Sequence, residues 1–501
     1  MQESIGEEEY DFLCQECDSL LKKGPNELSR KANSWLHIIR EHPIFLKSYF
    51  AIFKKGDISF ALFLFRKIIQ YMFFGGLKFI HSLYRNIIRK EQLKIINTSF
   101  DYMILSHLLN KDFLNRQSDF YFHELPQKLQ HQGGKVLMVY INYIGEVNHL
   151  IAKKWKSNEI DKLVLPRYLS TREELKIRAL LISDAFKLLF SASNGKRSRR
   201  IKFQAAIESL SPASHFNLRL GFQIKQIVKK TKAKQLFTTF EGHPWERIAF
   251  AMARKSNPQI KCVAYQHALI FRKQYAITRS LGINYNPDFI LCSGKDGQEK
   301  LKKANLISKD KIICFGSNRT ATALENVPIK IKQKRDTVLM LAEGDLIEVL
   351  PLIDFFYELS KQHKSLRFII RFHPITSIKK VLKARKHLNQ LPSNLIFSQC
   401  SFEEDLSRAD FAIYRGSTTI IKAIQYGLVP VYVKRPNEMS IDILYKFPSL
   451  RYEISNPKEF DHKVLNSFDE FDEKIIQLSK EVNQFFSPLN YDEALKINTT
   501  V

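Results

Sequence analysis

The hydrophobic pattern changes near Gly134, where short β-rich runs separated by helical stretches begin. Apolar runs bounded by turn residues are typical of strands, whereas Arg172–Ser191 and Trp245–Lys255 have the apolar spacing of helices. This alternation predicts a parallel sheet with crossover helices. The predicted strands of this first series are Val136–Ile141, Leu163–Leu165, Leu236–Phe240, Lys261–Tyr265, Phe289–Cys292 and Ile312–Phe315.

A second series of strand-like runs follows a charged, apolar-poor stretch, Asn318–Arg335, which we interpret as a connection. No sequence repeat relates the two series, and one large doubly wound sheet is the alternative architecture. We predict the α/β class, with Rossmann-like domains over residues 126–325 and 326–501 that face a cleft, because clefts between domains commonly bind ligands. The strands predicted for the second domain are Thr337–Ala342, Arg367–Phe372, Asn394–Phe397, Phe411–Tyr414 and Val429–Val433.

Residues 1–125 show no such alternation and are predicted to form a helical extension. The longest uncharged run of its most apolar part, Ile58–Ile88, is Ile68–Leu77, which is shorter than the ~20 apolar residues of a membrane span. From Lys78 onward, basic residues share one helix face and apolar residues the other, which favours a helix lying in a membrane interface. A buried helix with a solvated basic edge is the alternative. The expected membrane contacts are Lys78, Arg85, Arg89, Lys90 and Lys94, with Phe73, Phe74, Phe79 and Tyr84 beside them.

The chain has 501 residues, a net charge of +27 and a pI near 9.6, which together indicate an anionic partner. An anionic membrane surface, an acidic or nucleotide-activated saccharide and nucleic acid all qualify. The absence of a helix-turn-helix, zinc-finger or RNP pattern argues against nucleic acid. The acidic N-terminus has no apolar leader, and the six cysteines form no disulfide framework. We therefore expect a cytoplasmic protein, peripheral on the inner face of the cytoplasmic membrane.

Candidate chemistry in the first series lies where predicted strands end. Glu241 directly follows one strand and precedes Gly242, and a carboxylate at this edge of a sheet is well placed to act as a general base. Helix capping, with Glu246 favouring the helix dipole, is the alternative role for this turn. His267 follows the next strand and is expected to face the same crevice.

Three loops of the second series also follow strands. Glu343 and Gly344 close the first strand, and the glycine would let backbone N–H groups approach a phosphate. Arg371, His373 and Pro374 close the next, where the Arg and His suit an anion and the proline stiffens the turn. The third loop consists of Arg415, Gly416, Ser417, Thr418 and Thr419 and is predicted to open a capped helix.

The chain contains no Asp-x-Asp pair and no GxxxxGK[ST] motif. We therefore expect neither a metal nor a bound cofactor, and a leaving phosphate would be stabilised by backbone N–H groups and basic side chains.

At these residues the chain resembles glycosyltransferases of the GT-B fold, especially bacterial surface-carbohydrate biosynthesis enzymes. The acid-Gly turn at Glu241, the His-Pro turn at His373 and the hydroxyl-rich turn at Ser417 are similar to those of bacterial sialyltransferases and polysialyltransferases. In those families the acidic residue of the first turn acts as the general base, and the other two turns hold a CMP-activated sugar. The chain has Lys422 and Gln425 where many GT-B enzymes carry a ribose-binding Glu.

The resemblance implies a metal-independent, inverting glycosyltransferase that moves a sugar from a nucleotide donor, CMP being favoured, to a surface glycan or lipid-linked saccharide. It assigns the base role to Glu241 and the donor to the second domain, and we add His267 as a catalytic candidate because of its position after a strand. The alternatives are a sugar-nucleotide epimerase on the same fold and a non-enzymatic protein that binds membranes or nucleic acid.

Overall fold

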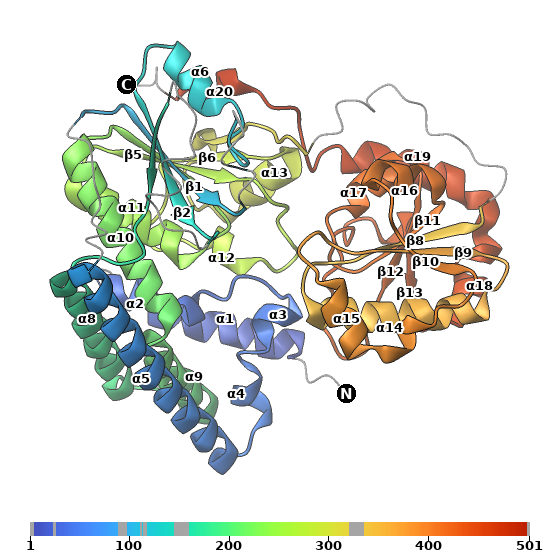
Figure 1. Cartoon of the computed structure of the whole chain (residues 1–501), viewed down its shortest axis with the longest axis horizontal. Coiled ribbons are helices and arrows are strands. Elements are labelled where there is room, and N and C mark those ends of the chain that lie inside the picture. The colour runs from blue at the N-terminus through green and yellow to red at the C-terminus, as the bar shows by residue number, and fades with distance from the viewer. Residues whose placement is uncertain are drawn as a thin grey trace.

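The computed structural model describes residues 5–23, 27–88, 98–110, 113, 118–144, 160–319 and 335–497. Two α/β domains lie side by side, and a group of long helices projects from the first (Figure 1). The predicted α/β fold with two parallel sheets and a helical N-terminal region is therefore confirmed. The predicted connection Asn318–Arg335 lies largely outside the described residues.

The first sheet has seven parallel strands in the order β3-β2-β1-β4-β5-β6-β7. The strand bounds are β1 Tyr102–Leu108, β2 Val136–Asn142, β3 Asp161–Val164, β4 Gln235–Thr239, β5 Lys261–Gln266, β6 Phe289–Cys292 and β7 Ile312–Cys314. The helices between them are α6 Leu125–His131, α8 Thr171–Phe190, α9 Gly195–Ser209, α10 Pro212–Thr231, α11 Pro244–Ser256, α12 Tyr275–Thr278 and α13 Lys295–Ala304.

The second sheet has six parallel strands in the order β10-β9-β8-β11-β12-β13. The strand bounds are β8 Thr337–Leu341, β9 Arg367–Arg371, β10 Leu395–Phe397, β11 Phe411–Tyr414, β12 Val429–Val433 and β13 Tyr452–Ile454. Its helices are α14 Leu346–Gln362, α15 Ile378–Ala384, α16 Phe402–Arg408, α17 Ile420–Gln425, α18 Glu459–Lys463 and α19 Phe471–Val482, and α20 Tyr491–Lys496 follows them in the chain.

Strand β1 corrects the interpretation of residues 1–125 as wholly helical. It lies in the middle of the first sheet, where Tyr102 pairs with both Val136 of β2 and Gln235 of β4. Its sequence, YMILSHL, is almost continuously apolar because both faces of a central parallel strand are covered. Strand β13, which is only three residues long, was also not predicted.

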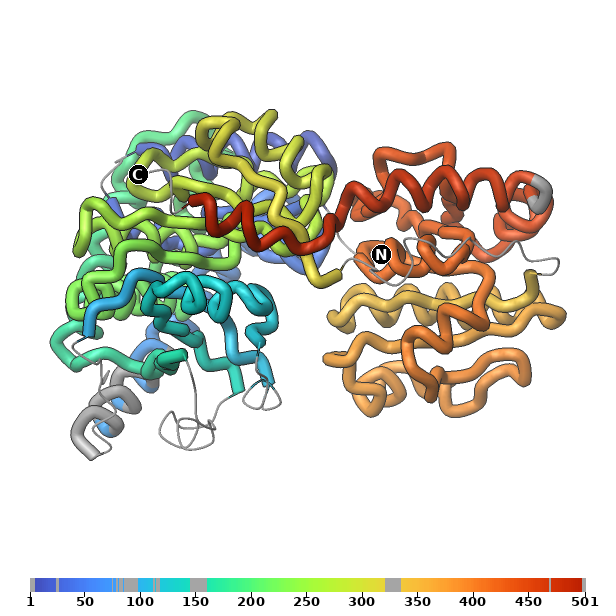
Figure 2. The backbone as a smooth tube through the Cα atoms, turned by 90° about the horizontal axis from the view of Figure 1, so that it is seen from above, coloured from blue at the N-terminus to red at the C-terminus, as the bar shows by residue number. Residues whose placement is uncertain are grey.

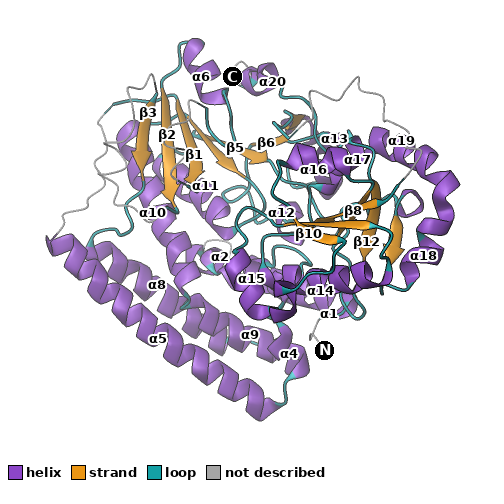
Figure 3. Ribbon diagram, turned by 45° about the vertical axis from the view of Figure 1, so that its right-hand side comes forward, coloured by secondary structure: helices purple, strands orange, loops and turns teal. Residues whose placement is uncertain are grey.

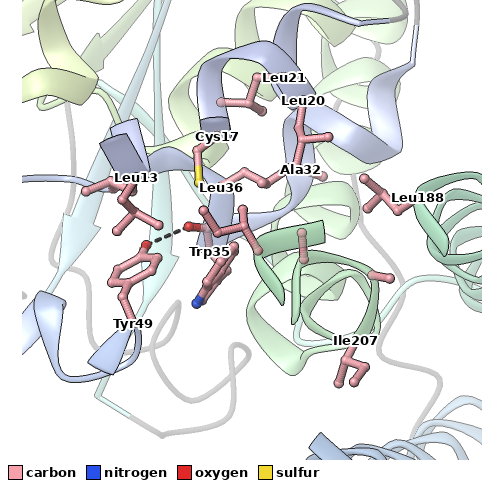
Figure 4. Packing of buried hydrophobic residues seen from close by; sticks show 14 of the residues in the cluster. Leu13, Cys17, Leu20, Leu21, Ala32, Trp35, Leu36, Tyr49, Leu188 and Ile207 are labelled. Carbon is pink, nitrogen blue, oxygen red and sulfur yellow. Dashed lines mark hydrogen bonds between the residues drawn. The ribbon is translucent and has the colours of Figure 1, made fainter. Parts of the chain in front are cut away.

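The N-terminal extension packs into the first domain. Its helices are α1 Glu7–Lys22, α2 Leu28–Ala32, α3 Pro43–Leu46, α4 Phe50–Lys54 and α5 Asp57–Ile88. Figure 4 shows Leu13, Leu21 and Trp35 of this region in one cluster with Leu188 of α8 and Ile207 of α9. The Tyr49 hydroxyl donates a hydrogen bond to the Trp35 carbonyl at 2.5 Å and ties the cluster together. Because these side chains are buried, the extension is part of the first domain's core.

Helix α5 runs beside α8 along the projecting group (Figure 3). Its stretch Asp57–Leu77 is long and apolar enough to cross a membrane, by length and composition alone. The sequence analysis reached a different result, because it counted only the uncharged run Ile68–Leu77, which is too short to cross a membrane. The side chains of Lys78, Phe74, Phe79 and Arg85 lie outside the described part of the structure, as do residues Arg89, Lys90 and Lys94.

The chain returns to the first domain after it has completed the second (Figure 2). The Ser317 N–H donates to the Ser487 carbonyl at 2.8 Å, and the Asn490 N–H donates to the Phe315 carbonyl at 2.8 Å. Helix α20 then packs against α6 and β7, and Ala494 is buried there.

Candidate functional site

Both sheets have the Rossmann strand order, in which the chain runs outward from the first strand on one side and then on the other. The order therefore reverses between β1 and β4 in the first sheet and between β8 and β11 in the second. Open α/β sheets bind ligands outside the carboxyl ends of their strands at this reversal. The turn containing Glu241 follows β4, and the turns containing Glu343 and Gly416 follow β8 and β11.

Glu241 lies between two imidazoles at this edge of the first sheet. Its Oε1 is 3.2 Å from Nε2 of His267, and its Oε2 is 3.7 Å from Nε2 of His243. Burial alone would raise the pKa of Glu241, but the adjacent His243, His267 and Arg40 hold it well below its usual value. Burial lowers the pKa of His267 to about 4. At neutral pH, Glu241 is therefore ionised and His267 neutral, and the structure brings these two predicted residues together.

The backbone of the Glu241 turn is held by the Glu246 carboxylate. Glu246 accepts hydrogen bonds from the N–H groups of Glu241, Gly242 and His243 at 2.8–3.1 Å. Gly242 has φ +87°, and a Cβ there would lie 2.3 Å from the backbone of Ala276. The glycine is thus required by the chain's own packing. Glu246 has the structural role that the capping alternative gave it, and the side chain of Glu241 is left facing the site.

An aromatic cluster of His107, Tyr121 and Trp245 lies beside His267, and the sequence analysis missed it. His107 is the penultimate residue of β1, its Nε2 lies 3.2 Å from the Thr239 hydroxyl, and burial lowers its pKa to about 4. Its ring centroid is 5.2 Å from Trp245 and 5.4 Å from Tyr121, and Tyr121 is 4.6 Å from His267. Aromatic faces of this kind, beside polar groups, suit the apolar face of a sugar ring.

In the second domain, Glu343 connects three parts of the chain. Its Oε1 accepts the Gly416 N–H at 2.9 Å, and its Oε2 is 2.8 Å from Nε2 of His42, which belongs to the N-terminal extension. Burial alone would raise the pKa of Glu343, but His42, Arg40 and the Gly416 N–H bring it below its usual value. A Cβ on Gly416 would lie 2.7 Å from Oε1 of Glu343, so only glycine allows this approach.

His373 and Pro374 form the predicted turn, since the Thr376 N–H donates to the His373 carbonyl at 2.8 Å. Burial lowers the pKa of His373, so its half-buried imidazole is neutral at pH 7. Its Nδ1 is 3.3 Å from the Ile375 N–H. A Cβ on Gly344 would lie 3.2 Å from this same Nδ1, so the two predicted loops are in direct contact.

The two predicted arginines are engaged within the protein. Arg415 is buried and donates to Glu348 at 2.8 Å, to Glu438 at 2.9 Å and to the Val433 carbonyl at 3.0 Å. Arg371 donates to the buried Asp405 at 2.6 Å. Their charges are therefore already balanced by carboxylates, and both side chains stabilise the second domain.

The hydroxyl-rich turn differs from the predicted capped helix. Helix α17 begins at Ile420, and no side chain caps it. The Ser417 hydroxyl instead lies 2.7 Å from the Thr419 hydroxyl. Because α17 has only six residues, its dipole is weak. An anion at this turn would therefore be bound mainly by the backbone N–H groups of the turn, including that of Thr418.

Arg40 is a second residue that the sequence analysis missed. It lies in the extension two residues before His42, and its guanidinium is 3.9 Å from the ring centroid of Phe271. Burial lowers the pKa of Arg40, and the negative charges of Glu241 and Glu343 oppose this effect. Within the described residues no carboxylate forms an ion pair with it. Arg40 is thus a preorganised cation between the acidic residues of the two sheets.

A pocket of about 570 Å³ adjoins this site at the junction of the extension and both domains. Tyr10, Phe271, Gln274, Lys300 and Tyr445 are among its lining residues. Among the described residues, no group of three or more His, Cys, Asp or Glu side chains could hold a metal ion. Metal-free activity stays a prediction.

No protein-family model and no curated protein matches the chain. A solved glycosyltransferase of kitacinnamycin aligns with a TM-score of 0.45 at 11% identity, over 80% of this chain and 98% of its own. A glycosyltransferase from Rickettsia africae ESF-5 aligns with a TM-score of 0.42 at 16% identity, over 79% and 97%. The UDP-GlcNAc 2-epimerase from Methanocaldococcus jannaschii aligns with a TM-score of 0.39 at 12% identity, over 80% and 99%.

Proposed function

We propose that the protein is a glycosyltransferase that moves a sugar from a nucleotide donor to a saccharide or lipid-linked saccharide. One observation carries the proposal. The ionised Glu241 of one Rossmann-like domain and Glu343 of the other lie at the strand-order reversals of their sheets, and Arg40 interacts electrostatically with both. Arg40 is half-buried, and a cation that forms no ion pair with any described carboxylate, placed in a ligand-binding crevice, suits an anionic ligand.

On the donor side, Arg40 would bind the phosphate of the nucleotide, with His373 and the N–H groups of the turn at Ser417–Thr419 beside it. Hydrogen-bond donors and cations that are already fixed in place stabilise developing negative charge without having to reorganise. This is the main electrostatic source of catalysis. The stack on Phe271 holds the Arg40 guanidinium in position before the ligand arrives. Arg371 and Arg415 shape this side of the site through their ion pairs.

On the acceptor side, a saccharide would stack on the half-buried Tyr121 and present a hydroxyl to Glu241. That oxygen attacks the anomeric carbon, the bond from this carbon to the nucleotide phosphate breaks, and the electron pair leaves with the phosphate. The hydroxyl proton passes to Glu241 as the new bond forms and the oxygen becomes acidic. Attack opposite the leaving group inverts the anomeric centre. His267, 3.2 Å away, would orient the carboxylate.

Glu241→Gln tests this role. The amide keeps the shape of the side chain but cannot accept the proton, so turnover should fall about 10²–10⁴-fold. Nucleotide affinity should stay within about twofold, because Arg40 and the second domain are unchanged. Glu299→Gln, an exposed substitution on α13, is the matched control and should have wild-type activity. A Glu241→Gln variant with full turnover would show that another group is the base.

The donor nucleotide is tested by thermal shift with CMP, CDP, UDP and GDP. The motif resemblance leads us to propose a cytidine nucleotide, so CMP or CDP should give the largest shift. A clear preference for UDP refutes the cytidine assignment and leaves the base assignment intact. Nucleotide release from a donor sugar without any acceptor would instead identify an epimerase.

A further inference from the structure

The outer side of α5 is apolar where a soluble protein is usually polar. Six of the large apolar side chains in its stretch Asp57–Leu77 are more than half exposed, up to 79% for Ile58. Apart from the adjacent Met72 and Phe73, they recur every three or four residues, and all six lie on one helix face. These residues are Ile58, Leu62, Phe65, Ile69, Met72 and Phe73.

Helix α8 continues this surface. Leu175, Ile182, Phe186 and Phe190 are exposed at helical spacing, and Phe190 is 84% exposed. The Arg178 guanidinium of α8 lies against Gly75 of α5, so the two helices are neighbours there, and both contact α9. We call these exposed residues of α5 and α8 the outer apolar face. Contiguous apolar surface of this extent marks an interaction site.

Cations border the outer apolar face on both sides. On α8, the exposed Arg172 and Lys176 project from the side opposite Arg178, which points toward α5. On α5, the exposed Arg66 projects from the side opposite Gly75, which faces α8. An apolar face between two basic edges matches the acyl chains and phosphates of an anionic bilayer.

We propose that the outer apolar face of α5 and α8 docks the protein on an anionic lipid surface. The two helices lie in the membrane plane, with Phe65, Ile69 and Phe186 among the acyl chains and the basic edges at the phosphates. This inference is independent of the proposed glycosyl transfer.

The inner side of α5 shows why the helix lies on the bilayer and does not cross it. Phe60 and Leu64 are buried in the core of the first domain. Lys67 forms an ion pair with Glu208 of α9, and the Tyr71 hydroxyl donates to the same carboxylate at 2.8 Å. A transmembrane α5 would break these contacts and leave Glu208 without them, which is costly for a mostly buried charge.

Charge decides between a lipid surface and a second copy of the chain. Two copies joined through the outer apolar face would bring their basic edges together, and like charges across a desolvated interface repel. An anionic bilayer neutralises the same cations, each worth about a fivefold gain in partitioning at low salt.

The test is sedimentation of the full chain with vesicles of phosphatidylcholine alone or with about 30% phosphatidylglycerol. We expect binding to the anionic vesicles. A variant with Phe65→Ser, Ile69→Ser and Met72→Ser should bind at least about tenfold more weakly, because three inserted side chains are lost. Phe186→Ser with Phe190→Ser tests α8 separately. Ile283→Ser with Ile396→Ser, two exposed apolar positions elsewhere, is the matched control and should bind like the wild type.

Replacing Arg66, Arg172 and Lys176 by Glu reverses their charge and should remove the preference for anionic vesicles. High salt should have the same effect on the wild type. Thermal melts confirm that each variant is folded, which is expected because every altered side chain is exposed. A wild type that stays in the supernatant overturns the proposal, and so does a serine variant that binds like the wild type. A dimer that only the serine variants dissociate, or retention on nucleic acid in place of vesicles, assigns the face to another partner and also overturns it.

Discussion

Replacing Arg415 by Met separates two roles for the same residue. The sequence motif places Arg415 on the nucleotide, whereas the structure buries it against Glu348 and Glu438. Removing one partner of a buried ion pair costs ~3–5 kcal/mol, because the other charge stays buried without compensation. Arg435 lies 3.0 Å from Glu438 and would still balance part of that charge. We therefore expect a loss of ~3 kcal/mol in the free energy of unfolding of the second domain.

This loss corresponds to a fall of about 6–12 °C in the melting temperature of a domain of this size. Scanning calorimetry measures it. All three tryptophans lie in the first half of the chain, so their fluorescence follows the first domain and serves as an internal reference. Arg367→Met removes an exposed ion pair to Asp336 in the same sheet and is the matched control, with an expected loss of at most ~1 kcal/mol.

Adding Glu348→Gln alone to Arg415→Met should recover part of the lost stability, because Glu348 is then no longer a buried charge and Glu438 keeps Arg435 as its partner. The structural role would be refuted if Arg415→Met melted like the wild type and lost nucleotide affinity. That outcome would return Arg415 to the donor site.

Three further predictions concern the turns and the contact between domains. Gly242→Ala should cost ~3 kcal/mol or more, through its positive φ and its clash with the neighbouring backbone, and should unfold the first domain at lower urea in tryptophan fluorescence. In a His243→Gln background, which removes the neighbouring imidazole whose pKa Glu241 raises, the lowered pKa values of Glu241 and His267 predict a kcat/KM that is constant from about pH 7 down to about pH 5, whereas an acid limb near pH 6.5 would identify a different base. His42→Ala removes the charged contact to Glu343 across the domains, worth ~1.5–3 kcal/mol, and should separate the calorimetric transitions of the two domains, which a weak contact would leave unchanged.

The sequence predicts a strand most accurately where turn residues mark both of its ends. β6, β11 and β12 have the predicted limits because turn residues bracket a buried apolar run. Strand β1 was missed because YMILSHL is equally compatible with a buried helix, and periodicity cannot separate the two for a short apolar run. Because β1 was not predicted, His107 was not recognised as a site residue either. A residue can be assigned to the carboxyl edge of a sheet only after its strand is recognised.

The candidate site was predictable only where it follows local rules. Glu241 and His267 were placed together because both follow strands of one sheet. Arg40 and His42 lie far from any strand in the sequence, and only tertiary packing brings them to Glu343. The role of Arg415 depended on Glu348 and Glu438, which no local pattern connects to it.

The return of the chain to the first domain has a consequence for its synthesis on the ribosome. Ala494 and Ile497 complete the apolar cluster around Phe122 and Phe315, yet they are translated only after the whole second sheet. Domains generally fold as units while the chain emerges. The newborn first domain must therefore keep this apolar surface uncovered until α20 arrives, which makes it a client for chaperones during that interval. Once α20 has docked, two chain crossings join the domains, and these two connections restrict rotation of one domain against the other.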